Sequence, residues 1–80
     1  MNNREILSAI EEVAHTHRIW EGTLGPDLRL NEDLYLDSLK ALTLAVEVEN
    51  KFRICLDPES EAEIVTVGDL VAAVRKELER

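Results

Sequence analysis

Residues 32–42 read EDLYLDSLKAL and open the most apolar helical segment of the chain. Asp37 precedes a run of helix-forming residues, which is the pattern of an N-cap whose carboxylate accepts N–H groups of the first turn. Ser38 then takes the first helical position, and we expect its Oγ at the surface. The partial positive charge and unpaired N–H groups of a helix start favour a phosphate ester there. A plain N-cap nevertheless explains the tripeptide Asp-Ser-Leu better when it is taken alone.

The predicted helix over residues 38–52 has two apolar stripes when each residue advances by about 100°. The second stripe holds Leu39, Leu42 and Val46, with Glu49 at its edge. Either the helix is central and buries both stripes, or the second stripe stays exposed and binds a partner. The pattern itself favours burial, whereas Ser38 at the head of the second stripe argues for a partner. The first stripe, expected in the core, contains Ala41, Leu44, Ala45, Val48 and Phe52.

An N-terminal helix is predicted over residues 4–16. Asn2 is its expected cap, with Glu5 three residues on as the partner in a capping box. The apolar residues recur on one face, as in an amphipathic helix. They are Ile6, Leu7, Ile10, Val13 and Ala14.

Residues 17–36 form a long connection that is rich in leucine and contains Gly22, Gly25 and Pro26. The alternation from Leu28 to Leu30 resembles a strand, but the sequence offers no partner strands for a sheet. We therefore expect a packed loop whose leucines cover the open end of a helical bundle. Trp20 is expected to pack this loop onto the core.

Two further helical segments complete the chain. Asp57 and Pro58 predict the start of a short helix. Thr66 and Asp69 have the spacing of a capping box and predict a last helix that ends at Arg80; its apolar stripe comprises Leu70, Val71, Val74 and Leu78. The sequence thus predicts an all-α four-helix bundle, with three main helices, one short helix and a long loop between the first two. We expect a single domain over residues 1–80.

The charge of the chain restricts its partners. Seventeen acidic residues oppose nine basic ones, giving a formal net charge of −8. This argues against binding to nucleic acid or to an anionic membrane surface and favours basic protein partners. No leader or bilayer-spanning run is visible, and Cys55 is the only cysteine, so we expect a cytoplasmic protein without an internal disulfide. Cys55 lies between Ile54 and Leu56 and is expected to be a small buried residue.

The residues needed for catalysis or metal binding are missing. A serine nucleophile needs a nearby base, but the two histidines, His15 and His17, fall near the end of the first helix and on different faces of it. The sequence contains no zinc-ligand spacing, calcium loop or glycine-rich phosphate loop. We expect neither an enzyme nor a metal site.

Taken together, these segments resemble the acyl carrier protein family of phosphopantetheine-binding domains. The resemblance covers nearly the whole chain and joins motifs that are each weak alone. They are the capped first helix, the leucine-rich loop, Glu32-Asp33-Leu34, Leu36-Asp37-Ser38-Leu39, the helix positions Leu44, Val48, Glu49 and Phe52, the short helix near residues 57–61, and Thr66-Val67.

The resemblance implies that a phosphopantetheinyl transferase attaches 4′-phosphopantetheine to Ser38, and that the thiol of this arm carries an acyl group as a thioester. Asp37 and Leu39 match the residues that flank the family's serine. The positions that partner enzymes read in such carriers are matched by Leu42, Val46 and Glu49.

On this basis we expect a non-catalytic, monomeric carrier for fatty-acid, polyketide or related biosynthesis, with acyl-loading and acyl-processing enzymes as partners. The start at Met1 favours a free-standing protein. The alternatives are an aminoacyl or peptidyl carrier and an unmodified helical adaptor that binds proteins through the second stripe. A fatty cargo is expected to lie between helices, against Leu44, Val48 and Val74.

The chain also departs from the family pattern. Tyr35 stands where the family often has glycine, and packing is its expected role. Lys40 and Thr43 replace residues that are usually acidic in fatty-acid carriers, and Glu47 takes a position that is usually apolar or small. A dedicated carrier for a secondary metabolite, polyketide, aminoacyl group or modified lipid is therefore at least as well supported as a general fatty-acid carrier.

Overall fold

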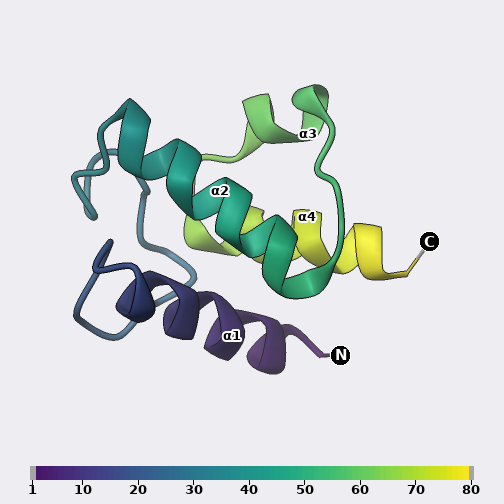
Figure 1. The fold of residues 1–80 in the computed structure, drawn as a ribbon, viewed down its shortest axis with the longest axis horizontal. Coiled ribbons are helices and arrows are strands. Elements are labelled where there is room, and N and C mark those ends of the chain that lie inside the picture. Colours follow the sequence, from purple (N-terminus) through teal and green to yellow (C-terminus); the bar gives the residue numbers. More distant parts are fainter. Residues whose placement is uncertain (1, 80) are drawn as a thin grey trace.

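The computed structural model describes residues 2–79, apart from the side chain of Ser60. The predicted all-α architecture of three main helices, one short helix and a long first loop is confirmed (Figure 1). Arg80, the predicted end of the last helix, lies outside the described residues. The helices are α1 (Asn3–Thr16), α2 (Ser38–Phe52), α3 (Pro58–Glu63) and α4 (Val67–Leu78).

Capping boxes fix the starts of α1 and α4, as the sequence predicts. At α1, Glu5 N donates to Asn2 Oδ1 at 2.8 Å, and Asn2 N donates back to Glu5 Oε1 at 3.5 Å. At α4, Asp69 N donates to Thr66 Oγ1 and Thr66 N donates to Asp69 Oδ2, both at 3.0 Å. These bonds satisfy N–H groups that have no partner within the helix.

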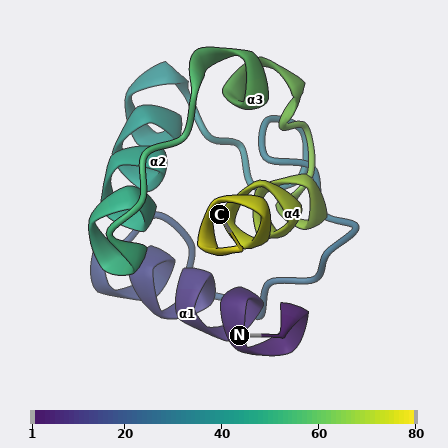
Figure 2. The same ribbon diagram turned by 90° about the vertical axis from the view of Figure 1, so that its right-hand side faces the viewer.

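The core lies between α1, α2 and α4, and Figure 2 shows α3 spanning the gap between α2 and α4. Each main helix contributes residues of its predicted stripe to the core, but five stripe residues are only partly buried: Leu7, Ala41, Ala45, Phe52 and Leu78. The loop leucines also pack inward, and Trp20 lies partly buried against the core, as expected. The buried residues are Ile6, Ile10, Val13, Ala14, Ile19, Leu24, Leu34, Leu36, Leu44, Val48, Leu56, Val67, Leu70, Val71 and Val74.

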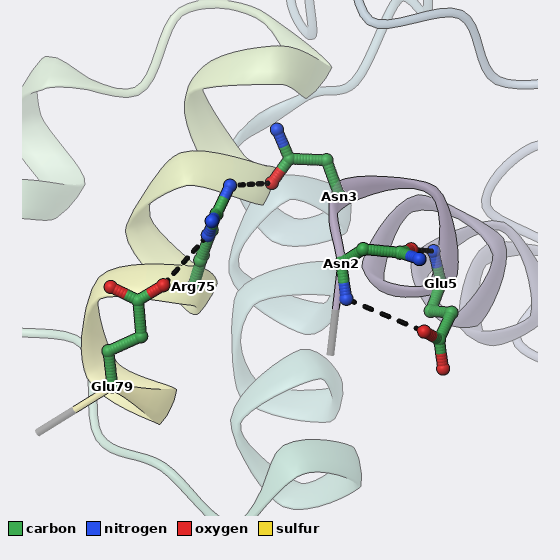
Figure 3. Close-up of polar contacts among 5 residues, drawn as sticks. All are labelled: Asn2, Asn3, Glu5, Arg75 and Glu79. Carbon is green, nitrogen blue, oxygen red and sulfur yellow. Dashed lines mark hydrogen bonds and ion pairs between the residues drawn. The ribbon is translucent and has the colours of Figure 1, made fainter.

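A polar contact joins the two ends of the fold (Figure 3). Arg75 Nη1 donates to Asn3 Oδ1 at 3.0 Å, and Arg75 Nε donates to Glu79 Oε1 at 2.8 Å. The guanidinium therefore connects the last turn of α4 to the first residue of α1, beside the Asn2–Glu5 capping box.

The long loop is held against the start of α4. Leu30 N donates to Val65 O at 3.0 Å, and Val67 N donates to Leu28 O at 2.9 Å, which forms an isolated antiparallel bridge between Arg29 and Thr66. The expected packed loop is confirmed. The segment from Leu28 to Leu30, for which the sequence offered no partner strand, pairs with residues 65–67 at the start of α4.

Candidate functional site

Asp37 sets the start of α2. Its Oδ1 accepts a hydrogen bond from Lys40 N at 2.8 Å, and its main-chain oxygen accepts one from Ala41 N at 2.9 Å. The predicted cap is confirmed, and Ser38 is the first helical residue. The Ser38 side chain is exposed, so a group attached to its Oγ would project into solvent.

The second apolar stripe of α2 is exposed. The fractional exposure is 72% for Leu39, 61% for Leu42 and 41% for Val46, so exposure is greatest beside Ser38. We call these three residues the apolar strip. Of the two alternatives for this stripe, burial is wrong and exposure is correct, because the loop leucines pack into the core instead of over the strip. Only the face that carries Leu44 and Val48 is fully buried.

Glu49 has an internal role that the sequence did not indicate. The residue is half-buried, and its Oε2 accepts a hydrogen bond from Leu56 N at 2.8 Å. This bond holds the connection between α2 and α3 against the end of α2. Of the three residues expected to bind partners, Leu42 and Val46 are thus open, whereas the Glu49 carboxylate already has a partner within the chain.

The acidic residues before α2 also make internal contacts. Glu32 Oε2 accepts from Arg29 Nη1 at 2.7 Å, and this hydrogen bond raises the pKa of the Arg29 guanidinium. Asp33 Oδ2 accepts from Arg29 N at 2.8 Å. The loop immediately before Ser38 is therefore organised by its own charges.

A cavity of about 310 Å³ opens beside α2. Its walls come from α2, α3, α4 and the long loop, and Leu44 is among them as expected. Val48 and Val74 were expected there as well, but both are fully buried in the core and neither lines the cavity. The lining residues are Leu30, Asn31, Ala41, Leu42, Leu44, Ala45, Leu56, Glu61, Ile64 and Leu70.

The spacing of Ala41 and Ala45 was the sequence signal for this cavity. Residues at i and i+4 share one helix face, and two small side chains leave space where α2 faces α3. Both alanines were predicted to belong to the core stripe. The structure shows them half-buried at the cavity wall.

Tyr35 and Cys55 differ from their predicted roles. Tyr35 is 82% exposed and does not pack; its φ of 54° lies in the left-handed region. Cys55 is exposed rather than buried. It stands in the irregular connection between α2 and α3, where its neighbour Leu56 is the residue buried in the core.

The two histidines lie at the end of α1, and each contacts a different residue. His15 Nε2 lies 2.8 Å from Gly22 O, and His17 Nε2 lies 3.1 Å from Glu47 Oε2. Within residues 2–79, no three His, Cys, Asp or Glu side chains gather as metal ligands. None of the helices built from these residues is long and apolar enough to cross a membrane.

The start of α2 suits a tethered phosphodiester. The Ser38 hydroxyl is exposed at the positive end of a 15-residue helix, where a phosphate gains about 0.3–1 kcal/mol from the helix dipole. The apolar strip begins at the next residue, and the cavity shares Leu42 with it. A flexible arm on Ser38 would have both apolar surfaces nearby.

Comparison with known proteins agrees with this geometry. Residues 4–74 match the family model described as the phosphopantetheine attachment site. The chain is 31% identical over 77 residues to the meromycolate extension acyl carrier protein of Mycobacterium tuberculosis, an alignment that covers 95% of this chain and 67% of that protein. It is also 31% identical over 74 residues to an acyl carrier protein of Kineococcus radiotolerans, with 91% of both chains covered. The chain therefore belongs to the acyl carrier protein family, whose domains carry 4′-phosphopantetheine.

Proposed function

We propose that this protein carries acyl intermediates on a 4′-phosphopantetheine arm attached to Ser38 Oγ. The observation that carries the proposal is the exposed Ser38 hydroxyl at the capped start of α2, directly before the apolar strip. The family's thiol-ended arm would hold the acyl group as a thioester. The protein would present this group to acyl-loading and acyl-processing enzymes without catalysing a reaction itself.

Asp37 and Leu39 have separate supporting roles in this proposal. Asp37 holds the first turn through its bond to Lys40 N, so the position of Ser38 is fixed relative to the helix. Leu39 is exposed and gives an incoming enzyme an apolar contact beside the reacting hydroxyl. Partner contacts would continue along Leu42 and Val46, while Glu49 supports α2 from within.

Attachment of the arm forms a bond between Ser38 Oγ and the phosphorus of phosphopantetheine and breaks the pyrophosphate bond of coenzyme A. Adenosine 3′,5′-bisphosphate is the leaving group, and the hydroxyl proton must also leave. Both histidines of this chain contact other groups near the end of α1. The proton acceptor would therefore come from the phosphopantetheinyl transferase. This chain would therefore be the substrate of the transfer, and the transferase its catalyst.

The cargo would be an acyl group, as the name of the acyl carrier protein family implies. The cavity would give a fatty chain an apolar binding site. The relatives from Mycobacterium are named for meromycolate extension, which supports a role in lipid assembly. Polyketide and related biosynthesis are also within the proposal, because Lys40, Thr43 and Glu47 depart from the residues that are usual in fatty-acid carriers. A cytoplasmic carrier that works as a monomer fits the proposal.

Modification at Ser38 is tested by incubating the purified protein with coenzyme A and a broad-specificity phosphopantetheinyl transferase. We expect the intact mass to rise by one phosphopantetheine group. Ser38→Ala should remove the gain completely. Ser8→Ala, which changes an exposed serine in the middle of α1, should leave it intact.

Each alternative gives a different result. A protein that gains no mass, but still binds another protein through the apolar strip after Ser38→Ala, is an adaptor. Mass gain followed by isolation of an aminoacyl or peptidyl thioester from native cells identifies the other class of carrier. An equal gain in Ser38→Ala and the unaltered protein rules out this site.

A further inference from the structure

The charged residues around the apolar strip form an unusual pattern. Angles of about 100° per residue place Lys40, Thr43 and Glu47 in one row along the strip, on the side away from Ser38 and Glu49. Thr43 Oγ1 donates to Leu39 O at 2.9 Å, so its hydroxyl is satisfied within the helix. Lys40 and Glu47 are thus the charged residues of this row.

The acidic side chains near the strip are already engaged. The Glu47 carboxylate lies 3.1 Å from His17 Nε2, and the Glu49 carboxylate accepts the Leu56 N–H. In the loop, Glu32 and Asp33 bind Arg29. Asp37 caps α2. A docking protein would therefore meet carboxylates that already accept a hydrogen bond from, or lie beside, another group of this chain.

Lys40 differs from all of these residues. Across residues 29–51, which the structure describes in full, every other charged side chain has a hydrogen bond or ion pair within the chain. The Lys40 side chain is exposed and has no ion pair with an acidic side chain of residues 2–79. Its ammonium group is available to another molecule.

Helix stability does not explain a lysine at this position. Lys40 is the third residue of α2, where the positive end of the helix dipole disfavours a cation and favours an acid. A glutamate here would also match the residue preferred opposite an N-cap. Lys40 is therefore placed against the local electrostatic preference, and it stands at the end of the strip nearest Ser38.

We propose that the apolar strip and Lys40 together bind a partner enzyme whose contact surface presents a carboxylate opposite Lys40 within an apolar patch. This inference rests on the proposed carrier function and specifies the partner of the same site. The net charge of −8 steers basic surfaces toward the molecule from a distance. At contact, the charged group beside the attachment serine is the Lys40 ammonium. Enzymes that present a carboxylate opposite it would bind better than those that do not.

The proposal is tested in native cells that produce a tagged copy of the chain from an inducible promoter. After induction, intact-mass measurements follow two rates, the appearance of the phosphopantetheine mass and the appearance of acylated protein. The variants are Lys40→Arg, Lys40→Ala and Lys40→Glu. Lys51→Glu is the matched control, because Lys51 lies within about 20° of Lys40 around α2 but about 16 Å further along it. Lys51 also has its own partner, Glu12, at 3.7 Å.

We expect Lys40→Glu to slow at least one of the two steps by about tenfold, since it turns an attraction at close range into a repulsion. Lys40→Arg should retain the native rates, and Lys40→Ala should fall between. Lys51→Glu should behave like the unaltered chain. Misfolding would not explain a loss in Lys40→Glu, because an acid at this position favours the helix; its midpoint in urea should equal or exceed the native value.

Faster or unchanged rates in Lys40→Glu would overturn the proposal, because a basic or neutral partner surface produces those results. A loss of equal size in Lys51→Glu would do the same, since it would reflect net charge rather than a local contact. If the unaltered chain gains no phosphopantetheine mass, the carrier function itself has failed. If all variants are modified and acylated at the native rates, only the inference about Lys40 is wrong and the carrier function stands.

Discussion

Tyr35 shows how one residue can keep a costly conformation next to a candidate site. Its φ of 54° falls in the left-handed region, which glycine adopts readily and other residues adopt at a cost. Hydrogen bonds on both sides hold the backbone there, from Leu34 N to Arg29 O and from Leu36 N to Leu30 O. The exposed ring has few contacts that would offset the cost. The glycine that the acyl carrier family often has at this position suits the same geometry.

Tyr35→Gly should therefore stabilise the protein. Glycine removes the strain of the left-handed conformation but loses more conformational entropy on folding. The net gain in the free energy of unfolding should be about 0.5–1 kcal/mol. The increase should appear as a higher midpoint of urea unfolding with an unchanged slope. Arg53→Gly provides a matched control, because Arg53 has a φ of 56° after the last residue of α2 and is also exposed. Both changes should stabilise; a loss in Tyr35→Gly alone would mean that the ring contributes to the fold.

Single exposed residues were the hardest to predict from the sequence. Ser38 and Asp37 were placed correctly because an N-cap depends on a few neighbouring residues. Tyr35 and Cys55 were predicted to pack, since aromatic and thiol side chains usually do. Their exposure depends on which way the backbone turns in the segments before α2 and after it, and this is determined by distant leucines in the core.

At the scale of the element, the start of α4 depends on the Asp69 carboxylate. Asp69 Oδ2 accepts hydrogen bonds from Thr66 N and Val65 N, both at 3.0 Å. These two bonds, the one from Thr66 first, hold the pKa of the Asp69 carboxyl below its ordinary value. The folded protein thus prefers the ionised form more strongly than the unfolded chain does.

The stability of the protein should follow the ionisation of Asp69. Because the folded-state pKa is the lower one, the contribution is complete above the unfolded-state pKa of about 3.9 and is lost as the pH falls through the folded-state pKa. Asp69→Asn should lower the urea midpoint at pH 7, and its difference from the native protein should narrow between about pH 5 and pH 2. Glu63→Gln, at an exposed site on α3, should show no such narrowing. A difference that is constant with pH would contradict the assigned role.

The helices themselves were largely predictable, whereas their exposed faces were not. Caps and apolar spacing are local patterns, and they located the starts of α1, α2 and α4 within about one residue. The last helix ends at Leu78, two residues before the predicted end. Whether the strip of Leu39, Leu42 and Val46 is covered depends on where the loop and α3 pack. Since α3 has only six residues, it leaves much of α2 open, and no periodicity in the sequence encodes that outcome.

At the scale of the whole molecule, the cavity exists because four segments meet around two alanines. Its volume is about 310 Å³. Leu44, Leu56 and Ile64 give it an apolar lining, while Asn31 and Glu61 also contribute to its walls. A medium-length acyl chain matches this space better than a bulky one does.

Loading the arm with saturated acyl chains of increasing length should therefore shift the methyl NMR signals of Leu56 and Ile64. The shifts should grow with chain length and then level off as the cavity fills. Methyl signals of Ile6 and Val13, on the α1 side of the core, should change little. Ala45→Leu should fill the space and abolish the shifts at Ile64, provided its urea midpoint stays near the native value. Shifts limited to Leu39 and Leu42 would mean that the chain lies on the outer surface.

The bridge between Arg29 and Thr66 has a consequence for the timing of modification during protein synthesis. Two backbone hydrogen bonds join the loop that leads into α2 to the start of α4: Leu30 N donates to Val65 O, and Val67 N donates to Leu28 O. A chain still being made on the ribosome lacks these partners until residue 67 has emerged from the exit tunnel. The turn that presents Ser38 therefore gains these hydrogen bonds only after residues 65–67 have been made. A transferase that recognises the folded start of α2 would therefore act only after residue 67 is free to pair with the loop.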